Sequence, residues 1–210
     1  TLSSGIVMTQ VAGGNVPKAL FHTILLNLIG VLSVPFMLQF VLGSAGLVSI
    51  SPLSVLMQLI LLVLLPFALG ALTRRVAGAA AAGHWLPRYL PSSCVIATVW
   101  VSASVSSGTL KAFDIGLLLR ILAGALLIHG TLLLLCYLAR YLYRPEYGEW
   151  QALLFTASQK TLPIALGLLA MISPAIGAAM VACLVFHFLQ LFLDSAIASR
   201  MARGSVVRAA

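Results

Sequence analysis

Long apolar runs, separated by short polar or small-residue stretches, dominate the chain. A helix needs about 20 predominantly apolar residues to cross a bilayer. This pattern predicts spans at 17–41, 52–72, 90–106, 115–142 and 174–198, with a weaker, interrupted run at 150–172. Residues 1–14 read as the end of a helix that begins upstream, and the chain starts with Thr, so we expect further sequence before it. The runs are too long and too continuous for barrel strands, so the pattern predicts an all-α, polytopic helical bundle.

Composition supports this fold class. Of 210 residues, 61% are hydrophobic and 8% are charged, whereas soluble domains have about 45–50% apolar and about 25% charged residues. The same composition excludes a disordered chain. Three cysteines lie in apolar runs without a C-x-x-C pair, so neither a disulfide framework nor a zinc site is indicated. We expect no cofactor, apart from sodium as a coupling ion.

The basic residues predict the orientation of the spans, because Lys and Arg collect in cytoplasmic loops. In the predicted topology nine basic residues fall on one side and one, Lys111, falls on the other. The nine are Lys18, Arg74, Arg75, Arg88, Arg140, Arg144, Arg200, Arg203 and Arg208. We therefore predict a multi-pass protein of the inner or plasma membrane with a cytoplasmic C-terminus. The net charge of +8 is explained by basic residues in the cytoplasmic loops, and we do not take it to indicate nucleic-acid binding.

Two segments interrupt the apolar pattern with polar residues. The first is residues 1–10, which contain Ser3, Ser4 and Thr9, and the second is residues 155–163. The second combines hydroxyls, an amide and an ammonium with a proline, which removes a backbone donor. Unwound backbone at membrane depth survives only inside protein or beside a wet cavity. Broken helices in matched positions of two halves point to the binding site of a secondary transporter.

Lys160 is the most informative residue of the second segment. It lies about ten residues into its run, where a charge costs about 2.5–3.5 kcal/mol on insertion scales. We expect it to need an acidic partner, a cage of carbonyl groups or a water-filled cavity. The alternative for the neighbouring Ser and Thr hydroxyls is a purely structural role, in which each donates a hydrogen bond to a carbonyl one turn back.

Further polar residues in the spans have two interpretations. His187, Gln190 and Asp194 share one helix face by their spacing, which either lines a cavity or makes interhelical hydrogen bonds. His22 and His129 each stand alone in the sequence, and we interpret them as packing groups. Pro35, Pro66 and Pro163 interrupt predicted helices and are candidate flex points.

Three segments of the chain resemble a known family. Residues 1–5, 12–15 and 27–31, with Pro35, resemble the fourth and fifth helices of the bile acid:sodium symporter family. Residues 155–167 are similar to the ninth, crossing helix of its SBF-like branch, where Ser-x-Lys-(Ser/Thr)-Leu recurs. The resemblance covers essentially the whole chain, as the second half of helix four to helix ten.

This resemblance implies ten helices in two inverted repeats, divided into a core and a panel. Residues 1–41 and 115–198 would form core-type helices, residues 52–106 panel-type helices, and residues 199–210 a cytoplasmic tail. Sodium-coupled members carry a Glu in the ninth-helix crossover. This chain has none there, which suggests that Lys160 replaces one sodium, directly or by cycling its proton. Carboxylate ligands for sodium would then come only from the sequence that we expect before residue 1. The candidate ion and substrate residues are Ser3, Ser4, Thr9, Thr23, Asn27, Ser158, Gln159, Lys160, Thr161, His187 and Gln190.

The sequence thus favours a secondary transporter that moves a small organic anion with a cation or proton by alternating access. An ammonium, hydroxyls and helix N-termini suit an anion. A monovalent cation/proton antiporter is the alternative, although Asp194 is the only intramembrane carboxylate in these predicted spans. An intramembrane hydrolase would need Ser44 in the 43–46 loop as nucleophile, but this loop lacks the G-x-S-x-G form.

Overall fold

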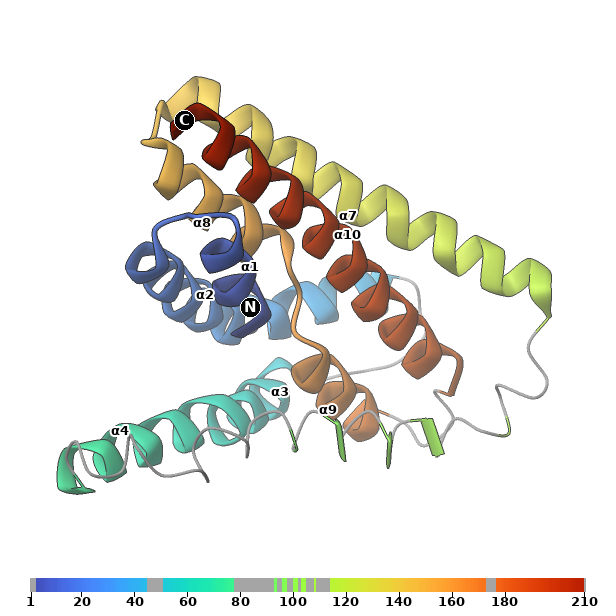
Figure 1. The fold of residues 1–210 in the computed structure, drawn as a ribbon. Helices are drawn as coiled ribbons and strands as arrows, with labels where there is room; N and C mark the ends of the chain where they lie inside the picture. Colours follow the sequence, from blue (N-terminus) through green and yellow to red (C-terminus); the bar gives the residue numbers. More distant parts are fainter. Residues whose placement is uncertain are drawn as a thin grey trace. The chain divides into compact units, whose positions relative to one another are not determined.

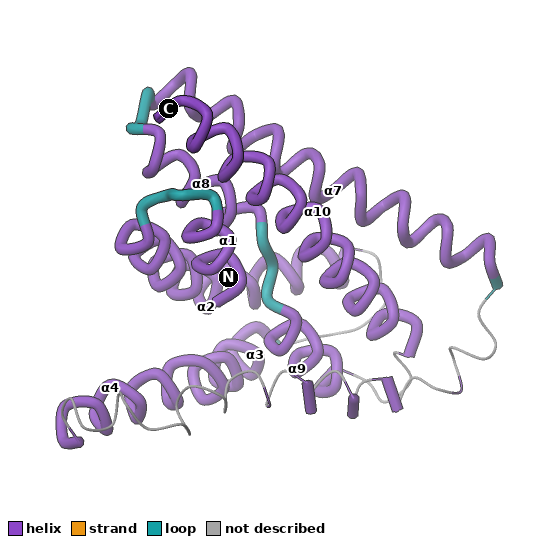
Figure 2. Tube along the Cα trace, viewed as in Figure 1, coloured by secondary structure: helices purple, strands orange, loops and turns teal. Residues whose placement is uncertain are grey.

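The fold is described from a computed structural model, which describes residues 3–44, 51–77, 114–172 and 177–209, with scattered positions between 93 and 108. Within these ranges the chain forms helices joined by short loops, and no strand (Figures 1 and 2). The chain divides into two compact units. The first unit contains Thr1–Leu28, Leu110–Leu162 and Val181–Ala210, and the second contains Ile29–Thr109 and Pro163–Met180.

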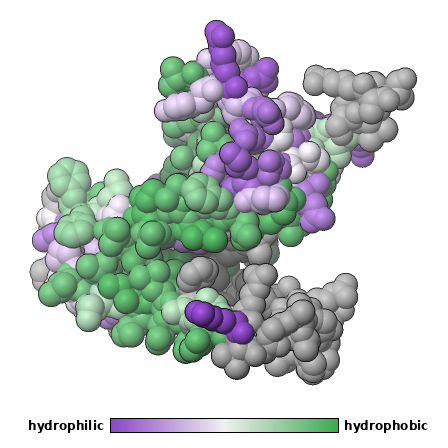
Figure 3. Space-filling model, turned by 90° about the vertical axis from the view of Figure 1, so that its left-hand side faces the viewer, coloured by the Kyte–Doolittle hydropathy of each residue, from purple (hydrophilic) through white to green (hydrophobic). Residues whose placement is uncertain are grey.

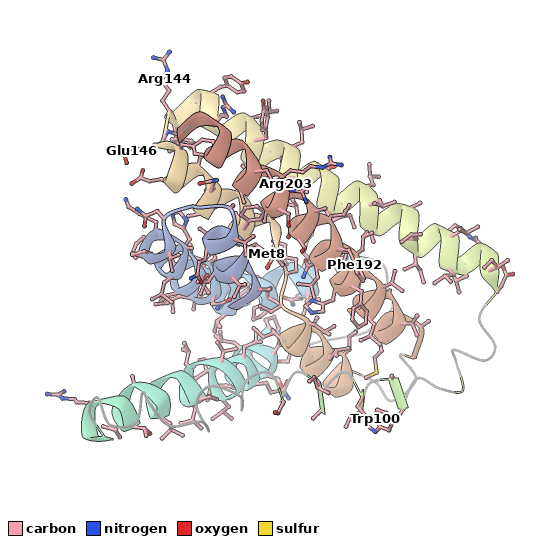
Figure 4. All side chains as sticks on the ribbon, viewed as in Figure 1. Met8, Trp100, Arg144, Glu146, Phe192 and Arg203 are labelled. Atoms are coloured by element: carbon pink, nitrogen blue, oxygen red, sulfur yellow. The ribbon has the colours of Figure 1, made fainter. Side chains whose placement is uncertain are left out.

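Four helices and the start of a fifth build the first unit. They are α1 (Ser3–Val11), the beginning of α2 (Val16–Ser44), α7 (Ile115–Tyr143), α8 (Tyr147–Ser158) and most of α10 (Gly177–Ala209). The short α8 packs against both α1 and α7. Its Trp150, Leu154 and Phe155 form an apolar core with Ala12 and Ala198, and Met8, labelled in Figure 4, packs against this core. Burial of these apolar side chains fixes α8 in the middle of the unit.

Turn chemistry sets both helix connections next to α8. Gly13 adopts a φ of 77° after α1, a left-handed conformation that glycine adopts without steric cost. Asn15 then caps α2, because its Oδ1 accepts the Lys18 backbone N–H at 3.0 Å. At the end of α7, Arg144 adopts a φ of 45°, and Pro145 follows where the helix cannot continue.

The second unit contains the rest of α2 and a helix whose hydrogen-bond pattern changes along its length. α3 (Pro52–Leu59) passes through a π-helical turn, η1 (Ile60–Leu64), into α4 (Leu65–Ala77). Pro66 lacks a backbone N–H, which frees the carbonyl of Leu62, and the Leu65 N–H bonds five residues back to Ile60. Wider turns of this kind accommodate a proline inside a helix. Val31, Val55, Leu59 and Leu168 form the core of this unit, the last from α9 (Leu162–Ile172).

Membrane-type surface covers the described helices. Three of them are long and apolar enough to cross a bilayer, at Val16–Val41, Ile115–Tyr143 and Ala178–Arg203. Many large apolar side chains are exposed, and green apolar surface covers much of the face in Figure 3. Extensive exposed apolar surface marks membrane contact, so the prediction of an all-α membrane protein is confirmed.

The predicted spans agree with the helices in position, with differences at their ends. The 52–72 span extends to Ala77 as α3, η1 and α4, and α10 continues as helix to Ala209 through the predicted tail. The predicted span at 90–106 lies mostly outside the described residues, and so does Lys111. The core and panel assignment stays a prediction, because the two compact units have other boundaries.

Candidate functional site

The second polar segment forms a break between two helices of the chain. α8 ends at Ser158 and α9 begins at Leu162, so residues 159–161 are not helical. We call these three residues the crossover, and they run as a loop in Figure 2. Gln159 has extended backbone angles, with φ −79° and ψ 144°. Pro163 stands in the first turn of α9, where its missing N–H costs no helical bond. The predicted helix interruption is confirmed.

One side chain of α10 holds the middle of the crossover. The Lys160 backbone N–H donates to Gln190 Oε1 at 3.0 Å, and the Lys160 carbonyl accepts from Gln190 Nε2 at 2.8 Å. Gln190 Nε2 also lies 3.1 Å from His187 Nδ1. The Lys160 side chain itself is exposed. Among the described residues no carboxylate forms an ion pair with its ammonium, so the structure gives an exposed lysine on a firmly held backbone.

A second chain of hydrogen bonds begins at the preceding residue. Gln159 Oε1 accepts from Ser4 Oγ of α1 at 2.7 Å, and Gln159 Nε2 donates to Asp194 Oδ2 of α10 at 2.7 Å. The other carboxylate oxygen, Asp194 Oδ1, lies 3.0 Å from His129 Nε2 of α7. The chain Ser4–Gln159–Asp194–His129 therefore ties α1, the crossover, α10 and α7 together.

Both chains are almost completely shielded from solvent. His129, Gln190 and Asp194 are fully buried, and Gln159 and His187 are 1% and 4% exposed. A buried polar group costs free energy unless it is hydrogen-bonded, and a buried charge costs more. Hydrogen-bonded polar networks instead rigidify a core, and here His129 Nδ1 is the one atom of the two chains that is buried without a partner among the described residues. The crossover is thus an anchored segment rather than a loose connection.

Two residues of this site were missed or undervalued by sequence reasoning. The origin of carboxylate ligands for sodium stays a prediction, but Asp194 brings one carboxylate to the crossover, where it bonds directly to Gln159. His129 was expected to be a satisfied packing group, and its partner across 65 residues of sequence is Asp194. The available signal was that both lie inside apolar helices, where each polar side chain needs a partner.

Two other predicted site residues bond back to their own helices. Thr9 Oγ1 donates to the Gly5 carbonyl and Ser158 Oγ to the Leu154 carbonyl, at 2.8 and 2.7 Å. These are the bonds to a carbonyl one turn back that a purely structural role predicts. In the same unit Thr23 is buried on α2, and Asn27 on α2 and Thr161 in the crossover are half-buried. The Ser3 side chain lies outside the described residues.

Small residues allow α1 to approach α8 closely enough for Ser4 to reach Gln159. A Cβ at Gly5 would lie 2.9 Å from the Phe155 carbonyl oxygen and 3.3 Å from Gln159 Oε1, so any larger residue must displace backbone. Gln151 Nε2 donates to the Ala12 carbonyl in the same interface, at 2.6 Å. Close backbone approach through small residues is typical of membrane helix pairs.

The described part of the chain contains no group of three or more His, Cys, Asp or Glu side chains that could hold a metal ion. The oxygens that gather at the crossover belong to Ser4, Gln159 and Asp194. Hard cations such as sodium prefer oxygen ligands of this kind. The site therefore presents an exposed ammonium on one residue and buried oxygen atoms around its neighbour.

Comparison with known families decides the class of the protein. Residues 1–203 match the SBF-like CPA transporter family. The chain belongs to this family. Its members are transporters and not enzymes, so the hydrolase alternative is dropped, and the predicted resemblance to the SBF-like branch is confirmed.

Individual relatives are similar over most of the chain. The chain is 29% identical to "Probable sodium/metabolite cotransporter BASS4, chloroplastic" of Oryza sativa subsp. indica, over 94% of this chain and 51% of that protein. It is 29% identical to "Uncharacterized protein PA2026" of Pseudomonas aeruginosa, over 97% of this chain and 62% of that protein. "Sodium/bile acid cotransporter 7" of Xenopus tropicalis is 31% identical over 45% of this chain and 27% of its own length. The chain spans about half the length of the first of these relatives, and no solved structure matches.

Proposed function

We propose that the protein works as a secondary active transporter, which moves a small organic anion together with a cation or proton by alternating access. The observation that carries this proposal is the crossover. It separates α8 from α9 and presents the exposed ammonium of Lys160, whose backbone N–H and carbonyl both bond to Gln190. A fixed cation beside a helix break is suited to an anionic substrate.

In this proposal the Lys160 ammonium binds the organic anion, and it also takes the place of one coupling cation. A lysine in the crossover replaces one sodium, directly or by cycling its proton, where sodium-coupled family members are expected to carry a Glu. Relatives with sodium in their names support sodium as the remaining coupling ion. Ser4 and Gln159 supply oxygen atoms at the crossover, and Thr23, Asn27 and Thr161 are the further candidate lining residues.

The moving parts follow from the family resemblance. Residues 52–72 and 90–106 are the proposed panel, which rocks against residues 1–41 and 115–198, with Pro35, Pro66 and Pro163 as flex points. The π-helical turn before Pro66 supports that position, since such turns mark helices that can bend. Arg140, Arg144 and the end of α10 face the cytoplasm in this proposal, by the positive-inside rule.

The first test is uptake by the full-length protein in liposomes, with sodium and pH gradients imposed separately. Labelled cholate and a set of small labelled carboxylates serve as probes. Lys160→Ala is expected to lower uptake about 10- to 100-fold, because a charge-assisted contact contributes about 1.5–3 kcal/mol. Lys18→Ala is the control, since Lys18 is an exposed residue paired with Glu149 at 2.9 Å. Full uptake by Lys160→Ala with unchanged ion dependence contradicts the assigned role.

One observation favours a second candidate, a monovalent cation/proton antiporter. Asp194 is a fully buried carboxylate paired with His129 inside two membrane-type helices, and intramembrane carboxylates mark ion and proton pathways. The same liposomes separate the candidates. Sodium/proton exchange without any organic substrate supports the antiporter, and ion flux that needs an organic anion supports the symporter.

A further inference from the structure

The backbone of Lys160 has a dedicated partner on α10. Inside a helix its N–H and carbonyl would bond to residues four positions before and after, and the crossover removes both partners. Gln190 supplies both replacements, with Oε1 for the N–H and Nε2 for the carbonyl. A primary amide is a neutral side-chain group that presents a donor and an acceptor side by side. Gln190 therefore pairs with one residue of the crossover as a neighbouring strand would.

Only one orientation of the Gln190 amide permits this pairing. A flipped amide would place its oxygen against the Lys160 carbonyl and its nitrogen against the Lys160 N–H. The second proton on Nε2 points to His187 Nδ1 at 3.1 Å, which accepts it when the ring carries its proton on Nε2. Gln190 is fully buried and His187 is 4% exposed, so the amide and its ring partner are shielded from water. His187 therefore completes the bonding of the amide in the one orientation that pairs with Lys160.

We propose that Gln190, whose amide also bonds to His187, is the positioning residue that holds the backbone of Lys160 and so presents its ammonium to the organic anion. This inference rests on the proposed function, in which Lys160 binds the anion. The oxygen and both amide protons of Gln190 are engaged by Lys160 and His187, so we assign Gln190 to positioning and not to contact with the anion. The side chain of Lys160 is exposed while its backbone is held, so Gln190 fixes the point of the chain from which the ammonium reaches the anion.

The closing experiment uses the full-length protein in liposomes and compares Gln190→Leu, Gln190→Glu and His187→Leu with the wild type. Gln39→Leu is the matched control, because Gln39 is an exposed glutamine of α2. Hydrogen exchange of peptides that cover residues 159–161 is the first readout, and it requires no transport. Exchange is expected to rise about fivefold or more in Gln190→Leu, which loses both bonds to Lys160, and less in Gln190→Glu, which keeps an acceptor for the N–H.

The second readout separates positioning from a merely structural role. Uptake of labelled cholate is measured in competition with methyl cholate, an uncharged analogue. In Gln190→Leu the KM for cholate is expected to rise about tenfold with turnover nearly unchanged, while inhibition by methyl cholate stays at the wild-type level. Equal loss of affinity for both compounds overturns the inference, since Gln190 then acts on the whole cavity and not through the ammonium.

The outcomes also separate this inference from the proposed function. If the wild type moves no organic anion, the proposed function fails, and the role in anion binding fails with it. Unchanged exchange at the crossover in Gln190→Leu overturns the inference even when transport is normal. If Gln190→Leu does not fold, Gln190→Glu and His187→Leu decide by the same two readouts, because each leaves part of the pairing intact.

Discussion

Replacing the buried pair of His129 and Asp194 one residue at a time is expected to destabilise the protein more than replacing both. The variants are His129→Leu, Asp194→Leu and the double variant. His129 Nε2 and Asp194 Oδ1 lie 3.0 Å apart, and both side chains are fully buried. Each single variant therefore strands polar atoms that water cannot reach, whereas the double variant removes both members of the pair.

The magnitudes follow from the bonds that each change leaves unmade. His129→Leu leaves a buried carboxylate without one partner, and breaking a buried pair in this way costs about 3–5 kcal/mol. Asp194→Leu strands donors on His129 and on Gln159, at about 1–3 kcal/mol each, so about 2–6 kcal/mol in total. The double variant strands only the Gln159 donor, at about 1–3 kcal/mol. The double variant is thus expected to be more stable than either single variant.

The assay is reversible unfolding of the full-length protein in mixed micelles, with the free energy of unfolding measured for all three variants. Thr131→Val is the control, because Thr131 is an exposed residue of α7 that bonds to its own helix. A double variant whose loss equals the sum of the two single losses would refute the reasoning, since independent sites add and paired sites do not.

Two further predictions concern the backbone. Gly5→Ala should lower the free energy of unfolding by about 1–3 kcal/mol, because its Cβ would lie 2.9 Å from the Phe155 carbonyl oxygen. Gly130→Ala is the control and should not lower it, because a Cβ there has nothing within 4 Å. Equal losses for the two variants in the same unfolding assay contradict the close approach at Gly5. Pro66→Ala restores a helical N–H, so amide exchange over Ile60–Leu64 should slow. Unchanged exchange there would mean that another feature sets the π-helical turn.

Sequence alone predicted the local part of the site. The change from apolar to polar residues before Pro163 located the helix break, because a polar run with a proline cannot continue as a lipid-facing helix. The spacing of His187, Gln190 and Asp194 placed them on one helix face. All three join the hydrogen-bond chains at the crossover.

Partnerships between distant helices could not be predicted in this way. The pairing of His129 with Asp194 depends on how α7 and α10 pack, and helical periodicity gives the face of a residue but not its neighbour. Hydroxyls were ambiguous for a similar reason. Every helix offers a carbonyl one turn back. Ser4 bonds to the Gln159 side chain and Ser158 bonds to a carbonyl of its own helix, yet the two serines look alike in the sequence.

The backbone pairing at Lys160 has a consequence for how this scaffold can diversify. At Lys160, Gln190 bonds only to the backbone N–H and carbonyl, which every residue except proline possesses, so this anchor does not depend on the side chain at position 160. Position 160 can therefore exchange its lysine for an acid, an alcohol or an apolar group while the surrounding packing is retained. A substitution at position 160 is therefore expected to change the charge at the crossover while both bonds to Gln190 remain.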